Sequence, residues 1–488
     1  MIGPRVLRHA LALAPQSDRV IFRRFIPSNA NRIMTILGRA MALSEAETAL
    51  HLAAMVAKFQ SRHFDLERDL MTTFRHVAHH LFTDVPLSME RRLLIGALFS
   101  GEFALESAAL FNPSIVPHPD QSGVPDRALR FVMSLRATGE GHISSIEFRT
   151  GLIRDAELTV DPVSRRVMLA ELAADPAFNK VAFAFKLHEM GFDNLHTAAV
   201  LDTLGEWFSL TDLNRSLARV RREGRPVKQE LHNTLRCILW LADSNYEMSF
   251  SPECELGNRA IFPVSASESN GIEDARFVRF VEDDGSVMYY ATYTAFSGSA
   301  VLPQLIETPD FLRFRVLTLN GSAVQNKGMA LFPRRIHGNY TMLSRQDDEN
   351  LFILYSDNPH YWNDPTLLIR PREMWEAVKI GNCGSPLETP EGWLVITHGV
   401  GPMRTYSIGA VLLDLDNPAK VIGRLRTPLI TPEENGREGY VPNVVYSCGS
   451  LIHAGTLVLP FALSDQSTTY ATVDLGELLA ALLGGAPA

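Results

Sequence analysis

Two adjacent carboxylates and a guanidinium begin an apolar stretch at residues 271–276, which read GIEDAR. Successive side chains of an extended strand point to opposite faces. We therefore expect Glu273 and Asp274 to face different ways, and Asp274 and Arg276 to share a face. One carboxyl can therefore face a pocket with a cation beside it, and carboxyl groups in sugar-lined pockets are the usual proton donors of glycoside cleavage. A turn followed by a strand with a surface ion pair is the simpler explanation of these six residues.

Six further segments accompany this one in a fixed order along the chain. They are LFNPSIV (110–116), SLRATGEGHISSI (134–146), NKGMALFP (326–333), YTMLSR (340–345), GWLVITHGV (392–400) and VPNVVYSCG (441–449). Together they resemble glycoside hydrolase family 130, the β-mannoside phosphorylases and related β-mannosidases. The resemblance covers roughly residues 105–155 and 245–478. It implies a five-bladed β-propeller.

The resemblance also implies a single catalytic carboxyl. Asp274 falls on the family's general acid, whose proton is thought to reach the glycosidic oxygen through a hydroxyl of the bound mannose. Planar amide, guanidinium and carboxylate groups suit adjacent sugar hydroxyls. The substrate-binding candidates are Asn112, Arg136, Glu273, Arg276 and Asp465. Taken singly, each would more often be a turn former or a surface ion-pair partner.

Inorganic phosphate is the nucleophile that the resemblance implies, because it is already charged and needs only positive side chains to hold it. Lys327, Arg345 and His398 supply such a set. Arg345 and His398 look like family phosphate ligands, whereas Lys327 stands where we expect an arginine. Lysine binds phosphate as a point charge rather than as a fork, so this substitution weakens the set. The alternative to a phosphate site is that these three side chains are unrelated cations that satisfy strand ends.

Water is the other candidate nucleophile, because the hydrolytic members carry carboxylates that activate it. Glu388 and Glu140 are the first candidates, and Glu391 is a poor one because it is a turn residue before Gly392. We expect an inverting phosphorolysis of β-mannosides that gives α-mannose 1-phosphate and a shortened acceptor. The alternatives are a β-mannosidase, acting on β-1,2-linked manno-oligosaccharides, and a non-catalytic sugar-binding propeller.

The composition is that of a folded enzyme without a nucleic-acid or membrane partner. Hydrophobic residues make up 46% and charged residues 21% of the 488 residues, and the net charge of −9 argues against a nucleic-acid footprint. No apolar stretch of about 18 residues predicts a membrane span. The four cysteines form no Cys-x-x-Cys pair. We expect a cytoplasmic protein with no metal and no cofactor, which uses phosphate as co-substrate and an oligosaccharide as substrate.

We expect a mainly β protein with two helical regions. The expected parts are an N-terminal helical region (1–104), a first propeller segment (105–155), a helical insertion (156–244) and the remainder of the propeller (245–488). In the first region, Ser44 and Glu47 form a capping box. Short strands alternate with turn signals from Arg259 onward. The two helical regions are expected to form a joint layer over one end of the propeller or a contact in a homo-oligomer.

Overall fold

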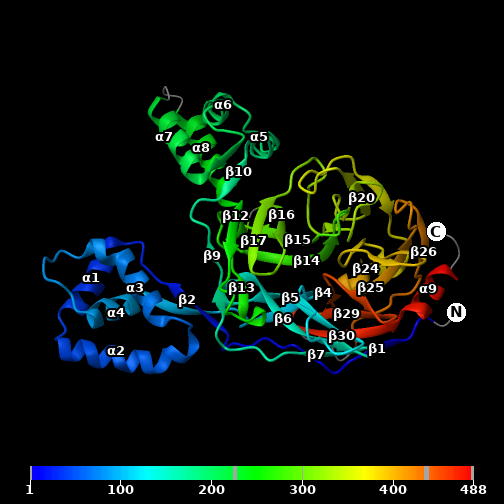
Figure 1. Ribbon diagram of the computed structural model, residues 1–488, viewed down its shortest axis with the longest axis horizontal. Coiled ribbons are helices and arrows are strands. Elements are labelled where there is room, and N and C mark those ends of the chain that lie inside the picture. The colour runs from blue at the N-terminus through cyan, green and yellow to red at the C-terminus, as the bar shows by residue number, and fades with distance from the viewer. Residues whose placement is uncertain (1–2, 224–227, 299, 434–438, 485–488) are drawn as a thin grey trace.

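The fold is mainly β, as the sequence predicts. A computed structural model describes residues 3–223, 228–298, 300–433 and 439–484. Figure 1 shows the larger sheets arranged around a common centre, with two helical lobes outside them. None of the described helices is both long and apolar enough to cross a membrane.

Most strands belong to runs of antiparallel neighbours that follow chain order. The first run is β4 (Ala109–Pro117), β5 (Ala128–Thr138), β6 (Ser144–Arg154) and β7 (Glu157–Val160). The second run is β14 (Gly271–Val281), β15 (Val287–Phe296), β16 (Val301–Thr308) and β17 (Arg313–Thr318), extended by β12 (Tyr246–Ser249) and β9 (Glu171–Leu172). Gly271 pairs with Ser144, which joins the two runs into one sheet. The short strands β13 (Arg259–Ile261) and β8 (Met168–Leu169) also pair at this junction.

Three further sheets follow. The third run is β18 (Ala330–Leu331), β19 (Tyr340–Ser344), β20 (Leu351–Ser356) and β21 (Thr366–Ile369). The fourth is β22 (Lys379–Asn382), β23 (Leu387–Thr389), β24 (Gly392–Val400), β25 (Tyr406–Leu413) and β26 (Val421–Arg424). The fifth is β27 (Val445–Tyr446), β28 (Leu451–His453), β29 (Thr456–Leu463), β30 (Ser467–Asp474) and the N-terminal β1 (Val6–Arg8). Because β1 pairs with β30, both ends of the chain build the fifth run.

Each run shares an apolar core with the next. The shared cores include Phe148 and Phe277 between runs one and two, Phe280 and Met342 between two and three, Leu343 and Trp393 between three and four, and Leu394 and Leu457 between four and five. Phe131 of the first run and Val458 of the fifth share one further core. The series of packed runs therefore returns to its starting point.

The first helical lobe contains α1 (Ala30–Met41), α2 (Glu45–Phe59), α3 (Leu66–Val77) and α4 (Met89–Leu98). It stands on a stem of two paired strands, β2 (Val20–Arg24) and β3 (Ser100–Ala104). The predicted capping box is present, since Glu47 N donates to Ser44 Oγ and Ser44 N donates to Glu47 Oε2. These bonds satisfy backbone donors that the first turn of α2 leaves free.

The second helical lobe is shorter than the expected insertion. Its helices are α5 (Lys180–Glu189), α6 (Leu195–Leu201), α7 (Leu210–Glu223) and α8 (Lys228–Asp243), beside the paired β10 (Ala177–Asn179) and β11 (Trp207–Ser209). Residues 156–179, expected to be helical, contain short strands instead. Asp155 and Ala156 both have positive φ, at 48° and 69°. Such a two-residue turn fits a hairpin and brings β7 back along β6.

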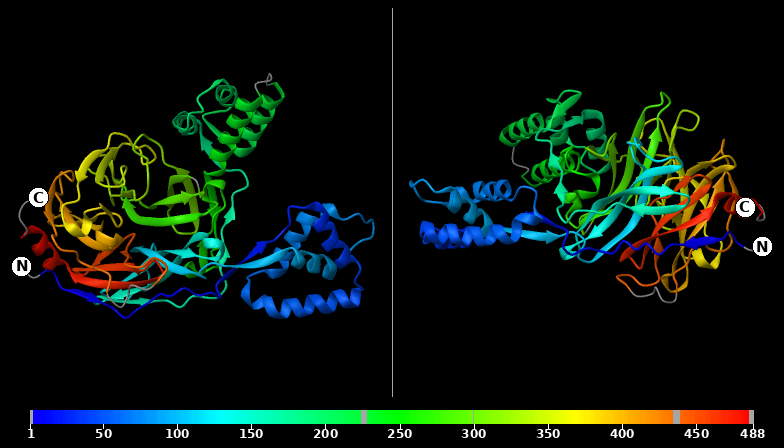
Figure 2. Two further views of the ribbon diagram at one scale, coloured as in Figure 1. Left: turned by 180° about the vertical axis from the view of Figure 1, so that it is seen from behind. Right: turned by 60° about the horizontal axis from the view of Figure 1, so that its bottom comes forward.

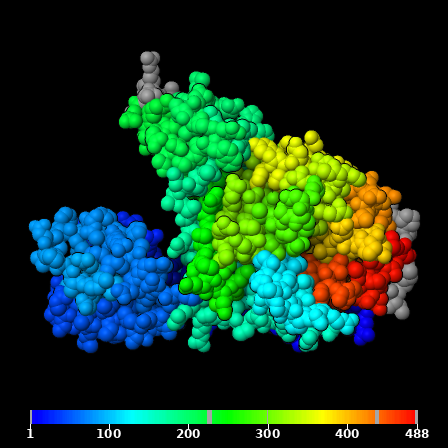
Figure 3. Space-filling model, viewed as in Figure 1, coloured from blue at the N-terminus to red at the C-terminus, as the bar shows by residue number. Residues whose placement is uncertain are grey.

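The two helical lobes do not form the expected joint layer. Figures 1 and 2 show α1–α4 and α5–α8 as separate bodies on different parts of the sheets. In the space-filling view of Figure 3, the lobe α1–α4 projects at the left and the lobe α5–α8 at the top. Each lobe has its own apolar core, around Ile33 in the first and Leu213 in the second. Their amphipathic faces are therefore buried within each lobe.

A buried ionic cluster fixes the stem of the first lobe to β6. Arg19, next to β2, lies 2.9 Å from Glu106 and 2.7 Å from Glu147. Arg149 pairs with the same two carboxylates. The side chains of Arg19, Glu106 and Glu147 have no exposed surface. Removing Arg19 would leave Arg149 as the remaining partner of both acids, so a buried charge would lose part of its compensation, which is destabilising.

We expect Arg19→Met to destabilise the fold by about 3–5 kcal/mol, because the buried carboxylate of Glu147 would lose a cation that holds its pKa low, while burial and Glu147 raise the pKa of Glu106 to about 8. The matched control is Arg165→Met, since Arg165 also pairs with a carboxylate, Asp18, but is 77% exposed. An exposed pair contributes little to stability. Thermal unfolding of both variants measures the difference. Equal melting temperatures for the two variants would contradict a structural role for the cluster.

Candidate active site

The sequence-predicted residues come from strand ends in all five runs. Asn112 lies on β4, Arg136 on β5, Glu273, Asp274 and Arg276 on β14, Lys327 before β18, Arg345 directly after β19, His398 on β24 and Asp465 in the turn between β29 and β30. Side-chain contacts join most of them into two groups. One group surrounds the carboxylates of Glu273 and Asp274, and the other is the pair of Arg345 and His398.

Arg136 holds both neighbouring carboxylates. Its Nη2 lies 2.7 Å from Glu273 Oε1, and its Nη1 lies 3.4 Å from Asp274 Oδ1. Asn112 Nδ2 donates to Asp274 Oδ1 at 2.6 Å, and Lys327 Nζ donates to Glu273 Oε2 at 2.7 Å. Arg276 donates to the backbone oxygen of Asp274 at 2.9 Å. The two acids are thus compensated by cations and an amide from other strands.

The predicted alternation of side chains along β14 is wrong at this point. Glu273 and Asp274 both contact Arg136, although ideal strand geometry would send them to opposite faces. The pairing of β14 with β15 shifts register between Glu273 and Arg276, which marks a bulge. A bulge inserts an extra residue and redirects the side chains beside it. This irregularity allows one arginine to bind two adjacent acids.

Three of the candidate residues have left-handed backbone conformations. The φ angles are 50° at Asn112, 55° at Asp274 and 51° at Asp465. The register of β4 also shifts, between Phe111 and Ser114, around Asn112. Among residues other than glycine, Asn and Asp adopt this region most readily. Backbone strain of this kind often clusters at functional sites.

The surroundings separate the proton affinities of the two aspartates. Burial opposes the charge of Asp274, but Arg136, Arg276, the hydrogen bond from Asn112 and Lys327 together hold its pKa below the usual value. Burial and the charge of Asp274 raise the pKa of Asp465 to about 6, although Arg136 partly offsets them. The site therefore contains one readily ionised carboxyl and one that retains its proton to higher pH.

Arg345 and His398 form a separate buried pair. Arg345 Nη1 lies 3.1 Å from His398 Nε2. Burial first, and then the charge of Arg345, lower the pKa of His398 well below its ordinary value. With its pKa lowered in this way the imidazole is neutral near pH 7, so the predicted set of three cations contains two there, Lys327 and Arg345. Lys327 contacts Glu273 rather than this pair.

Sequence reasoning missed the residues that make room for this pair. A Cβ on Gly381 would stand 2.2 Å from Arg345 Cδ and 2.6 Å from His398 Cε1. Tyr446 was also missed. Its hydroxyl accepts a hydrogen bond from Arg276 at 2.9 Å, and its ring lies 4.8 Å from that of His398. The only sequence signal for Tyr446 is its place in the segment 441–449.

The carboxylates considered as water activators lie elsewhere or are exposed. Glu388 binds Arg334 at 2.7 Å and pairs in register with Trp393 on β24. At about 3.3 Å per residue, His398 lies ~16 Å further along that strand. Glu391 is exposed in the same hairpin. Glu140 is exposed in the loop that follows β5, and Arg136 lies near that end of the strand.

Several polar atoms of the site have no partner within the described part of the chain. They include Asn112 Oδ1, Arg136 Nε, Arg345 Nε and His398 Nδ1. Leaving buried polar atoms unpaired costs stability, so they are natural contact points for a polar ligand. No group of three or more His, Cys, Asp or Glu among the described residues could hold a metal ion. The arrangement suits an uncharged polyhydroxyl ligand beside an anion.

Comparison with protein families gives a match over more than half of the chain. The model of glycoside hydrolase family 130, described as β-1,4-mannooligosaccharide phosphorylase, matches residues 232–483. This stretch includes Asp274, Lys327, Arg345, His398 and Asp465. Asn112 and Arg136 precede it in the sequence, and the fold brings them to the same site.

Individual relatives are mannoside phosphorylases. The chain is 33% identical over 231 residues to a 1,2-β-oligomannan phosphorylase of Thermoanaerobacter sp. (strain X514). This alignment covers 44% of this chain and 74% of that protein. It is 30% identical over 227 residues to a β-1,2-mannobiose phosphorylase of Listeria innocua, covering 45% of this chain and 62% of that protein. A solved structure of β-1,2-mannobiose phosphorylase from Listeria innocua with β-1,2-mannobiose aligns with a TM-score of 0.46 at 20% identity, over 78% of this chain and 94% of that one.

We predict that Asp465→Asn stabilises the protein more at pH 7 than at pH 4. In the unfolded chain this carboxyl loses its proton near the ordinary value of 3.8, whereas the folded protein retains it to about 6. Ionisation therefore costs the folded wild type stability as the pH rises through that range, and the amide removes the cost. Melting temperatures measured across this range provide the test. The gain should shrink in an Asp274→Asn background, and a pH-independent difference would contradict the assignment.

Proposed function

The chain belongs to glycoside hydrolase family 130, and we propose that it is an inverting phosphorylase of β-mannosides. The observation that carries the proposal is the family match, which spans the segment from Asp274 to Asp465. The relatives described above are named for β-1,2-linked mannosides and the family model for β-1,4-linked ones. Manno-oligosaccharides of both linkages are therefore the substrates to test first.

We propose that the five runs of strands are the five blades of a β-propeller. The closed series of shared cores supports this arrangement, because the fifth run packs on the first through residues such as Phe131 and Val458. Candidate residues from different runs would then meet near the propeller axis. A radial arrangement of sheets suits a ligand site built from many short strand ends.

In the proposed reaction, a phosphate oxygen attacks the anomeric carbon of the mannosyl unit while the glycosidic C–O bond breaks. The carboxyl of Asp274 supplies the proton that the departing oxygen needs, directly or through a sugar hydroxyl. The products are α-mannose 1-phosphate and the shortened acceptor. Attack from the face opposite the departing oxygen inverts the anomeric centre. Asn112, Arg136 and Asp465 hold the sugar through hydrogen bonds.

Asp274 must carry a proton for this role, although its pKa is held low in the ligand-free structure. Phosphate changes that balance, because its negative charge offsets the nearby cations that favour the ionised carboxylate. Sugar hydroxyls that bind Arg136 compete for the same guanidinium. We infer that substrate and phosphate together raise the proton affinity of Asp274.

The phosphate site is proposed at Arg345, His398 and Lys327. Among the residues that the structure describes, Arg345 Nε and His398 Nδ1 have no hydrogen-bond partner. A neutral imidazole can donate one hydrogen bond to phosphate and accept one from Arg345. Lys327 reaches the anion by exchanging its contact with Glu273. This division leaves Arg136 and Asp274 to the sugar.

We predict that Asp274→Asn lowers turnover of β-mannobiose by roughly 10²–10⁴-fold, since the amide cannot donate the required proton. The matched control is Asp283→Asn, because Asp283 is 77% exposed in the turn that follows the same strand. Mannose 1-phosphate and reducing sugar are measured from β-1,2- and β-1,4-mannobiose, with and without phosphate. Equal cleavage without phosphate would replace phosphorolysis by hydrolysis, with Glu140 as the first candidate base.

A second prediction tests the phosphate site through its backbone. Gly381→Ala should raise the KM for phosphate by roughly tenfold or more, because the new Cβ displaces Arg345 and His398. Gly101→Ala is the control, since nothing lies within 4 Å of a Cβ at that position. Steady-state kinetics at varied phosphate and fixed sugar distinguish a change in the KM for phosphate from a change in the KM for sugar. An unchanged KM for phosphate together with a raised KM for sugar would move the anion site elsewhere.

A further inference from the structure

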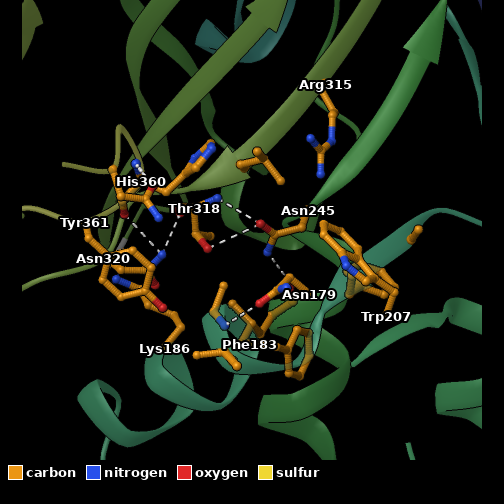
Figure 4. Close-up of a pocket in the computed structure, with 17 residues that line it drawn as sticks. Asn179, Phe183, Lys186, Trp207, Asn245, Arg315, Thr318, Asn320, His360 and Tyr361 are labelled. Carbon is orange, nitrogen blue, oxygen red and sulfur yellow. Dashed lines mark hydrogen bonds between the residues drawn. The ribbon is translucent and has the colours of Figure 1, made fainter. Parts of the chain in front are cut away.

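A cavity away from the candidate active site, which we call the distal pocket, lies between the lobe α5–α8 and the edge of the second run (Figure 4). Its volume is about 350 Å³. Phe183 and Trp207 line it from the lobe, and Thr318, His360 and Tyr361 line it from the sheets. The candidate active-site residues are not among those that line it. Because β15 and β16 separate β17 from β14, the two sites are ~14 Å or more apart across the sheet.

Polar atoms in the distal pocket lack partners within the described residues. They are Asn320 Oδ1, His360 Nδ1 and Tyr361 Oη. Asn320 is only 2% exposed, and its Nδ2 donates to Thr318 O at 3.2 Å, which fixes the amide and leaves its oxygen free. Figure 4 shows Asn320, His360 and Tyr361 together on one side of the pocket. Buried polar atoms are normally paired, so this wall is suited to a hydrogen-bonding ligand.

The cations around the distal pocket are already compensated. Lys186 Nζ lies 3.0 Å from Glu189 and donates to Leu319 O at 2.7 Å. Arg315 lies 3.5 Å from Glu247 and 3.6 Å from Glu307. An anionic ligand would have to displace these carboxylates. A neutral ligand would not, and the charge distribution therefore favours an uncharged molecule.

Aromatic side chains complete the distal pocket. Trp207 is 56% exposed although it lines the cavity, and Figure 4 places it on the side away from Asn320. The Tyr361 ring is held by an edge contact with Phe185, at 4.9 Å between ring centres. A pyranose ring offers an apolar C–H face to such a side chain and hydroxyls at its edge. Aromatic residues with a polar tip serve ligands of this mixed character.

We propose that the distal pocket is a second carbohydrate-binding site, which takes a neutral oligosaccharide between Trp207 and the wall of Asn320 and Tyr361. The unpaired amide oxygen and phenol bind sugar hydroxyls, and the indole packs on a ring face. Binding here requires no turnover, so the site stands independently of the proposed phosphorolysis. It would hold a glycan on the protein while the active site acts on a chain end.

Titration calorimetry with neutral trisaccharides tests the proposal on the full-length protein. The panel contains β-1,2-mannotriose, β-1,4-mannotriose, cellotriose and maltotriose, with mannose 1-phosphate as the anionic comparison. We expect at least one trisaccharide of the panel to bind the wild-type protein. Its affinity should fall about tenfold in Trp207→Ala, because the contact with the indole ring is lost. Tyr361→Phe should weaken the same ligand by roughly three- to tenfold, because it removes one hydroxyl from the buried wall.

Two control variants match these substitutions. Phe82→Ala removes an aromatic ring that is 90% exposed on the first lobe, and Tyr355→Phe removes a hydroxyl on β20. Both should leave trisaccharide affinity unchanged, and melting temperatures verify that every variant is folded. Trisaccharide affinities that are the same in wild type, Trp207→Ala and Tyr361→Phe would overturn the proposal. The absence of any trisaccharide binding to the wild-type protein would also overturn it. Preferential Trp207-dependent binding of mannose 1-phosphate would overturn the neutral ligand class. If the wild-type protein shows no phosphorolysis but still binds a trisaccharide in a Trp207-dependent manner, only the catalytic proposal is refuted.

Discussion

The attachment of Arg136 to two adjacent carboxylates is the interaction on which the site depends. Glu273 and Asp274 are neighbours on one strand, and both are largely buried. Without a shared cation they would repel each other in a poorly solvated place. Arg136 reaches them from the first run, and Lys327 reaches Glu273 from the loop before the third. The packing of separate runs against one another therefore determines whether these acids can be ionised.

This compensation requires a specific backbone as well as specific charges. The bulge in β14 brings both acids to one guanidinium, and the irregularity in β4 brings Asn112 to Asp274. Regular strands would direct Asp274 away from Glu273 and break the arrangement. The cores between runs supply the rigidity that holds such strained positions. The packing between runs and the geometry of these charged residues therefore depend on each other.

Much of this arrangement could be predicted from the sequence, and the reasons for the failures are local. The capping box at Ser44 follows from residue types alone, so it was confirmed. The opposite faces assigned to Glu273 and Asp274 assumed an ideal strand, and only the pairing with β15 reveals the bulge. Charge on His398 could not be read from its residue type, because burial and Arg345 determine its protonation. The role of Gly381 is likewise invisible until Arg345 is placed beside it.

The charge balance of the site explains why phosphate, rather than water, suits it. Apart from the Lys379–Asp348 ion pair, whose charges cancel, the cations that act on Asp274 or His398 are Arg136, Arg276, Lys327 and Arg345, and the acids of the site are Glu273, Asp274 and Asp465. Since the pKa of Asp465 is raised to about 6, this acid gains and loses its proton close to neutral pH. With Asp465 protonated, the four cations and two ionised acids give a net charge of +2. With Asp465 ionised, the net charge is +1. A phosphate ion carries a similar amount of negative charge at neutral pH, so its entry brings the pocket close to neutrality. An attacking water brings no charge, would leave this net positive charge in place, and would need a further carboxylate to activate it.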